Sequence, residues 1–144
     1  MLHDGGVAMV ARSLLGLPIQ PTGDDAADLT PDPAALKRPL RVVSLGGNDV
    51  VVDGTAMPFV ALLVRELPAL QEMRLAVNDM GFAVRLLADA LRQRRAAGRP
   101  DIRLLDISGN LCHPKAVSDV VDACIECRVA QLEIGGNFGS EERV

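Results

Sequence analysis

The chain has 144 residues, of which 49% are hydrophobic and 24% are charged, and its net charge at pH 7 is −4. This composition is typical of one folded unit and argues against a disordered chain. An acidic chain with no Trp, no Tyr and three Phe residues also lacks the clustered basic charge and the stacking side chains of a nucleic-acid surface.

The first predicted element is a helix within residues 1–17. Its apolar residues recur at the spacing of one helix face, and they are Val7, Val10, Ala11, Leu14 and Leu15. The run at residues 6–15 matches residues 54–63 without a gap at a glycine, at Ala-Met and at Leu-Leu. Because the second run lies in a later strand–helix unit, we interpret residues 1–17 as a partial N-terminal repeat.

Residues 18–39 are predicted to be a loop insertion. They show little apolar periodicity, three aspartates lie within residues 24–28, and the prolines are Pro18, Pro21, Pro31, Pro33 and Pro39. Proline and aspartate are turn and loop residues, so the insertion is expected to leave the stack between the first helix and the first strand.

From residue 40 onward one nine-residue phrase recurs. The first, fourth and sixth positions of the phrase are apolar, and the ninth is an asparagine. The copies are Leu40–Asn48, Leu70–Asn78, Ile102–Asn110 and Val129–Asn137. The alternating apolar positions predict a short strand in each copy. Recurrence every 27 to 32 residues predicts a stack of equivalent units.

A helix is predicted after each of the first three phrases. The apolar stripes are Phe59, Leu62, Leu63 and Leu67, then Val84, Leu87, Ala88 and Leu91, then Val117, Val121, Cys124 and Ile125. Residues 92–101, with four arginines, are predicted to be a second, shorter extruded segment. Residues 40–144 therefore contain three full strand–helix units and a fourth, truncated one.

The phrase and its following helix resemble the leucine-rich repeat of the long, helical, ribonuclease-inhibitor-like type. The best copy is Ile102–Asn110, and the resemblance covers residues 40–137 and the partial N-terminal unit. It implies an α/β fold, a right-handed horseshoe-shaped solenoid segment with parallel strands on the concave side and helices on the convex side.

In this family the concave sheet is the main partner-binding surface. The expected partner-binding residues are those between the buried apolar positions: Arg41, Val42, Ser44, Gln71, Glu72, Arg74, Arg103, Leu104, Asp106, Ala130, Gln131 and Glu133. Four of them are predicted to form one column, namely Ser44, Arg74, Asp106 and Glu133. The alternative is that these side chains are simply solvated or form ion pairs between strands.

The last residue of each phrase is an asparagine. We predict a structural ladder in which these amides satisfy backbone groups where the chain turns out of each strand, formed by Asn48, Asn78, Asn110 and Asn137.

Catalytic and metal sites are not expected. Cys124 and Cys127 form a C-x-x-C pair that, with Cys112 and His113, has the residue types of a zinc site, but Cys124 lies on an apolar helix stripe. Buried cysteines are therefore preferred to a metal or redox site. No nucleophile, base and acid combine into a catalytic set, so we expect no enzyme, no metal and no cofactor.

These patterns together predict a scaffold for protein–protein interaction that binds a protein partner, with no nucleic acid and no membrane. Two alternatives stay open. The resemblance also implies a regulator of an enzyme such as a small GTPase (GTPase-activating-like) or an immune-type sensor segment, and the other alternative is a structural component of a cytoskeletal or axonemal assembly. The absence of a signal-like N-terminus and the odd number of cysteines favour a cytoplasmic location. Self-association is expected through uncapped ends.

Overall fold

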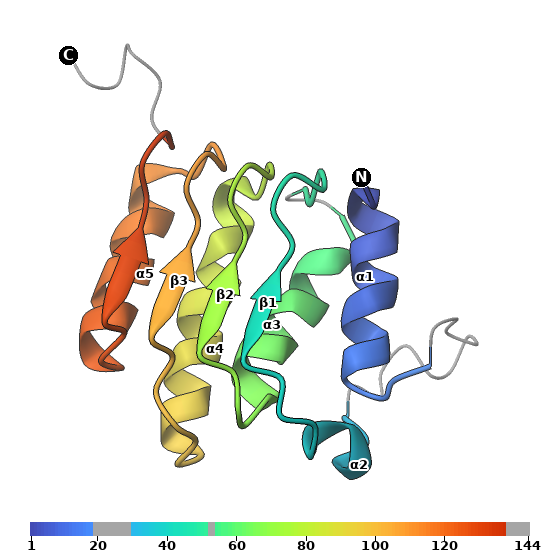
Figure 1. Cartoon of the computed structure of the whole chain (residues 1–144). Helices are drawn as coiled ribbons and strands as arrows, with labels where there is room; N and C mark the ends of the chain where they lie inside the picture. Colours follow the sequence, from blue (N-terminus) through green and yellow to red (C-terminus); the bar gives the residue numbers. More distant parts are fainter. Residues whose placement is uncertain (19–29, 52–53, 138–144) are drawn as a thin grey trace, which may run out of the picture.

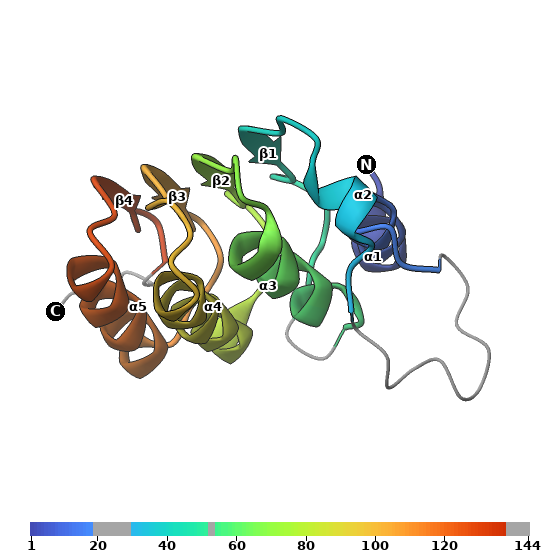
Figure 2. The ribbon, with the colours of Figure 1, turned by 90° about the horizontal axis from the view of Figure 1, so that it is seen from below.

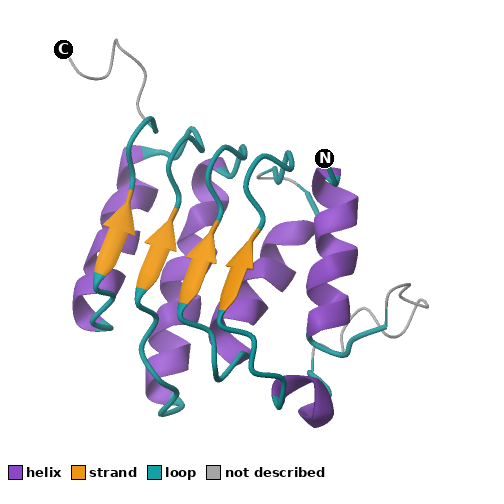
Figure 3. Cartoon of the chain, in the orientation of Figure 1, coloured by secondary structure: helices purple, strands orange, loops and turns teal. Residues whose placement is uncertain are grey.

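The computed structural model describes residues 1–18, 30–51 and 54–137. Within these residues the chain is an α/β protein whose short parallel strands alternate with helices (Figure 1, Figure 3). The strands lie side by side in chain order, and they are β1 (Val42–Ser44), β2 (Glu72–Arg74), β3 (Leu104–Asp106) and β4 (Gln131–Glu133).

The longer helices form a layer on one face of this sheet and leave its other face open (Figure 2). Along this layer α1 packs on α3, α3 on α4, and α4 on α5. The helical segments are α1 (His3–Leu14), α2 (Pro33–Leu36), α3 (Ala56–Glu66), the 3₁₀ helix η2 (Gly81–Val84), α4 (Arg85–Ala96) and α5 (Pro114–Glu126).

The core lies between the sheet and the helices. Strand register aligns one inward row, which consists of Val43, Met73, Leu105 and Leu132. Two residues further along each phrase Leu45, Leu75 and Ile107 are buried, whereas Ile134 is partly buried. Each fully buried Leu or Ile contributes roughly 1.5–3 kcal/mol, which a single strand–helix unit could not obtain without its neighbours.

The predicted apolar stripe of α5 is wrong at its C-terminal end, because Ile125 is 73% exposed. Arg92 of α4 contacts Asp119 and Glu126, so these two residues mark the side of α5 that faces α4. At 3.6 residues per turn, Val121 and Ile125 lie on the other side. The helix instead buries the side that faces the sheet and α4, through Ala116, Val120, Ala123 and Cys124.

Two predicted loop segments are partly helical. Residues 33–36 form α2 because the Asp32 side chain accepts a hydrogen bond from Ala34 N at 3.0 Å and Pro33 occupies the first turn. Residues 19–29 of the same predicted insertion lie outside the described residues. Residues 92–96 belong to α4, whose Arg94 is buried rather than extruded.

Three helices end in the same way. The residue after the C-cap has a positive φ in α1 (Gly16, 69°), α4 (Gly98, 74°) and α5 (Arg128, 58°). In each, the next backbone N–H returns to a carbonyl five residues back: Leu17 to Arg12, Arg99 to Arg94 and Val129 to Cys124. The end of α3 differs, because its C-cap residue Leu67 is extended and is followed by Pro68.

The first turn of α3 is capped by another helix. Asp4 of α1 accepts hydrogen bonds from Thr55 N at 2.7 Å, Ala56 N at 3.2 Å and Val51 N at 3.0 Å. Thr55, the N-cap residue, makes no side-chain capping bond of its own. Gly54 is required here because a Cβ at this position would overlap the Asp4 carboxylate. The sequence pattern gives no sign of this contact, since capping motifs are sought next to the helix that they cap.

The phrase-ending asparagines are linked to one another from unit to unit. The backbone N–H of Asn48 donates to Asn78 Oδ1, that of Asn78 to Asn110 Oδ1, and that of Asn110 to Asn137 Oδ1, at 2.7–3.1 Å. The Asn110 amide, fully buried, donates to Leu75 O of the preceding unit and to Ile107 O of its own. The side-chain amides of Asn78, Asn110 and Asn137 therefore each bridge two units, whereas that of Asn48 bonds only within its own turn.

We expect Asn110→Leu to lower the free energy of unfolding by about 1–3 kcal/mol, because it leaves buried backbone groups without partners. Urea denaturation followed by circular dichroism measures this loss. The matched control is Asn48→Leu, whose side chain is partly exposed and should cost less. Equal unfolding midpoints for Asn110→Leu and the unsubstituted chain would contradict a stabilising ladder.

Candidate functional site: the open face of the sheet

Strand register brings the predicted partner-binding residues into rows across the open face. One row contains Val42, Glu72, Leu104 and Gln131, and the other contains Ser44, Arg74, Asp106 and Glu133. The second row is the column predicted from the repeat spacing. Immediately before the strands the structure places the remaining candidates, which are Arg41, Gln71, Arg103 and Ala130.

Most of these side chains reach solvent, but two do not. Leu104 is 5% and Asp106 is 8% exposed. Val42 on the edge strand is 45% exposed. The other ten predicted residues therefore provide most of the surface available to a partner. The β3 side chains Leu104 and Asp106 contribute little to it.

Charge on this face is concentrated around Glu72. Its Oε1 lies 3.0 Å from Arg74 Nη2 and 3.9 Å from Arg103 Nη2. The Arg103 side chain remains 69% exposed, whereas that of Glu72 is 17% exposed. Exposed ion pairs of this kind contribute about 0–1 kcal/mol. Arg103 therefore keeps most of its hydrogen-bonding capacity for a partner.

Asp106 has a local role. Its Oδ1 accepts hydrogen bonds from Ser108 N at 3.0 Å and Ser108 Oγ at 2.6 Å, which shapes the turn after β3. At the edge strand, Glu133 accepts from the Gln131 side chain at 2.7 Å. The acidic end of the predicted column thus combines one buried, turn-forming carboxylate with one accessible carboxylate.

Val77, in the turn after β2, is an exposed apolar residue that the sequence interpretation did not select. Its φ is 58°, a left-handed conformation that is strained for a β-branched residue, and it is 66% exposed. The residue just before the ladder asparagine is a glycine in the other units, namely Gly47, Gly109 and Gly136. The absence of this glycine from one unit is the sequence signal that could have identified Val77. Strain retained at an exposed position is a feature of functional surfaces.

The helix layer has a shallow groove between α3 and α4. It encloses about 220 Å³ and its lining includes Pro58, Leu62, Leu86 and Asp89. Phe82 of η2 lies nearby, 48% exposed, with its ring stacked on that of His113 at a centroid distance of 4.3 Å. No sequence motif marked this groove, because its residues come from two separate helices.

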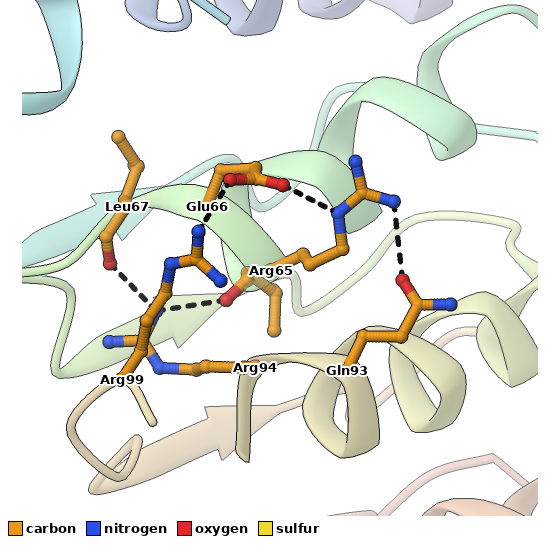
Figure 4. A network of polar contacts seen from close by, with 7 residues as sticks. Arg65, Glu66, Leu67, Gln93, Arg94 and Arg99 are labelled. Carbon is orange, nitrogen blue, oxygen red and sulfur yellow. Dashed lines mark hydrogen bonds and ion pairs between the residues drawn. The ribbon is translucent and has the colours of Figure 1, made fainter. Parts of the chain in front are cut away.

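The most extensive polar cluster surrounds Arg94 (Figure 4). Its guanidinium group donates to backbone carbonyls at the end of α3, in the turn after α3 and in the segment after α4, with the shortest bonds, 2.6 Å, to Leu67 O and Pro100 O. Arg94 is 2% exposed, and burial lowers its pKa to about 10, so it remains charged at neutral pH. The cluster is fully occupied by the chain's own carbonyls and is therefore structural.

A second ion-pair network lies beside it. Glu66 accepts from Arg65 at 2.7 Å and from Arg99 at 2.9 Å, and Arg65 also donates to the Gln93 side chain at 3.2 Å. These contacts join the ends of α3 and α4 (Figure 4).

All three cysteines are buried free thiols. Burial raises the pKa of Cys112 and of Cys124 to about 11, and it also raises the pKa of Cys127. Thiols that stay protonated at neutral pH are poor nucleophiles and poor metal ligands. Within residues 1–18, 30–51 and 54–137, no group of three His, Cys, Asp or Glu residues is placed to hold a metal ion.

Comparison with protein-family models gives no match to this sequence, and comparison with curated proteins gives none either. In the described part of the chain, no helix has the length and apolar character needed to cross a bilayer.

Arg94→Lys is expected to destabilise the chain by about 2–4 kcal/mol, because an ammonium group cannot reach the carbonyls that the planar guanidinium group serves. Chemical denaturation gives the difference. Arg95→Lys, at an exposed position one residue later, is the matched control and should change stability by less than about 0.5 kcal/mol. Similar effects of the two substitutions would show that the buried arginine has no special role.

Thiol chemistry provides a separate prediction. Because a pKa of about 11 instead of the ordinary 9 leaves far less thiolate near pH 8, Cys112 and Cys124 should react about a hundredfold more slowly in the native chain than in the urea-unfolded chain. A chromogenic disulfide reagent measures these rates. A native thiol at either position that reacts as fast as in the unfolded chain would contradict the buried assignment.

Proposed function

We propose that the chain is a segment of a leucine-rich-repeat solenoid that binds a protein partner on the open, concave face of its sheet and acts in the cytoplasm without catalysis. The observation that carries the proposal is the one-sided arrangement of the fold. The longer helices all cover one face of the sheet and leave the other to solvent (Figure 2). Repetition of one nine-residue phrase in all four strands supports the repeat assignment.

The chemistry of this face favours a partner of mixed charge. Arg103 and Arg41 are exposed near the start of the strands, and Glu133 is accessible near the end of β4. Arginine is among the residues that most often dominate binding energy, whereas Trp and Tyr are absent here. A partner segment with a carboxylate facing Arg103 would use the strongest available contact on this surface.

The test is charge reversal on the two sides of the sheet. Arg103→Glu should weaken binding of the protein partner at least roughly tenfold, the loss expected for a central arginine contact. Affinity capture from cell extract with quantitative mass spectrometry identifies proteins retained by the unsubstituted chain, and titration of each purified protein then gives its affinity.

The matched control is Arg95→Glu, which makes the same change of charge at an exposed position on α4. It should leave partner binding unchanged. The proposal fails if every captured protein binds Arg103→Glu as well as the unsubstituted chain, or if Arg95→Glu causes the larger loss.

A further inference from the structure

The residues that come just before the strands form a row of side-chain donors beside the open face. The row consists of Arg41, Gln71 and Arg103, which belong to three successive units. All three residues are exposed, and within the described part of the chain their side chains make no hydrogen bond. Two guanidinium groups and one amide are therefore available to a partner.

The sheet fixes the spacing of this row. Arg41 O accepts a hydrogen bond from Gln71 N at 2.8 Å, and Gln71 O accepts one from Arg103 N at 2.7 Å. Because neighbouring strands of a sheet lie about 4.8 Å apart, the backbones of Arg41 and Arg103 are separated by roughly 10 Å, with Gln71 between them. The two arginines thus have a defined separation across the strands.

The acidic residue closest to the row is already neutralised. Glu72 follows Gln71 directly and forms an ion pair with Arg74 at 3.0 Å. The contact between Glu72 and Arg103 is longer, 3.9 Å, and the Glu72 side chain is only 17% exposed. Since Arg74 offsets the charge of Glu72, Arg41 and Arg103 remain as two positive charges that attract a negatively charged ligand.

We propose that this row binds an acidic segment of a protein partner, extended as a polyproline II helix across the strands, with one carboxylate on Arg41 and a second on Arg103. The inference deepens the binding proposed for the open face and rests on it. In polyproline II, residues three positions apart lie on the same side at a separation of roughly 9 Å. Same-side residues of a β-strand are instead about 7 or 13 Å apart, which fits the two arginines less well.

Gln71 suits the middle of such a segment. A polyproline II backbone makes no internal hydrogen bonds, so its N–H and C=O groups are open to a partner. The amide of Gln71 can both donate to and accept from these groups. The row therefore matches an acidic residue, two neutral residues and a second acidic residue.

Charges of both signs flank the row and limit what it can bind. Lys37 and Arg38 are exposed near Arg41, whereas Asp32 caps α2, Asp101 is exposed before β3 and Glu133 is accessible on β4. These carboxylates repel a polyanion with a charge on every unit, such as nucleic acid. They tolerate a segment whose two carboxylates lie on the arginines, and they favour neutral or basic residues around that pair.

The apolar surface of the open face does not suit a helical partner. A helix that binds in a groove needs apolar anchoring sites on the receiving surface. Among the described residues of the strands, the large apolar side chains on this face are Val42, which is 45% exposed, and Leu104, which is buried. A line of polar groups without an apolar groove favours an extended segment.

Selection from a displayed library of random peptides tests the ligand chemistry directly. The unsubstituted chain should enrich peptides with two acidic residues three positions apart, and the double variant Arg41→Gln/Arg103→Gln should not. The proposal is overturned by a selection that enriches no such peptides, or by equal enrichment on the double variant.

Double-mutant cycles with one selected synthetic peptide test the arrangement. Replacing either acidic residue of the peptide by its amide should weaken binding to the unsubstituted chain about three- to fivefold, as for a well-oriented exposed ion pair. In Arg41→Gln one of these two peptide substitutions should lose its effect, and in Arg103→Gln the other should. Coupling of both acidic residues to the same arginine, or to neither, would contradict the proposed contact.

Controls separate this contact from general charge attraction and from misfolding. Arg95→Gln removes one exposed positive charge from α4 and should leave peptide affinity unchanged. Thermal unfolding checks that every variant is folded, and added salt should weaken peptide binding. An equal loss with Arg95→Gln, or displacement of the peptide by a single-stranded oligonucleotide, would show a general anion site and overturn the proposal.

This inference and the proposed function can fail separately. A captured partner that loses affinity with Arg103→Glu, but whose binding segment has no acidic pair, would refute the inference and leave the open-face proposal intact. Selection of acidic peptides as expected, without any captured protein that is sensitive to Arg103→Glu, would refute the proposed function and leave the ligand preference of the row standing.

Discussion

The stack depends on an amide that bonds to two units at once. A strand of three residues followed by a turn leaves backbone donors and acceptors unpaired in the interior, and hydrophobic burial cannot satisfy them. Asn78 and Asn110 satisfy these groups in their own unit and in the preceding one. Backbone pairing between the strands aligns the side chains of the open face into rows, and the asparagine amides join the turns that follow those strands.

Much of the fold could be predicted because its signals are local and repeated. The four strands, their order along the chain and the inward apolar row follow from one phrase that recurs at regular intervals. The error at Ile125 arose because helical periodicity identifies an apolar stripe but cannot distinguish a side facing the sheet from a side facing a further neighbour. The contacts of Asp4 and Arg94 were not predicted, because these side chains bond to backbone groups that lie far away in the sequence. No pattern of residue types reveals such contacts.

The open face was less predictable than the fold. Strand alternation correctly divides inward from outward side chains, yet exposure also depends on what the neighbouring strands carry. Leu104 and Asp106 on β3 are buried, whereas Val42 on the edge strand β1 is exposed and the outward residues of β2 lie between these limits. The positive φ of Val77 could have been anticipated only by comparing the units with one another and noticing the missing glycine.

The capping of α3 by Asp4 has a consequence for the order of folding. Its hydrogen bonds close chain segments 47 to 52 residues long, whereas the bonds within a helix span only one turn. Closing a long segment costs more entropy than extending a helix, so such contacts form after local structure has appeared. The first turn of α3 is therefore fully stabilised only after α1 has packed against it. The beginning of the chain thus supplies hydrogen bonds to a unit whose strand, β1, lies about forty residues downstream.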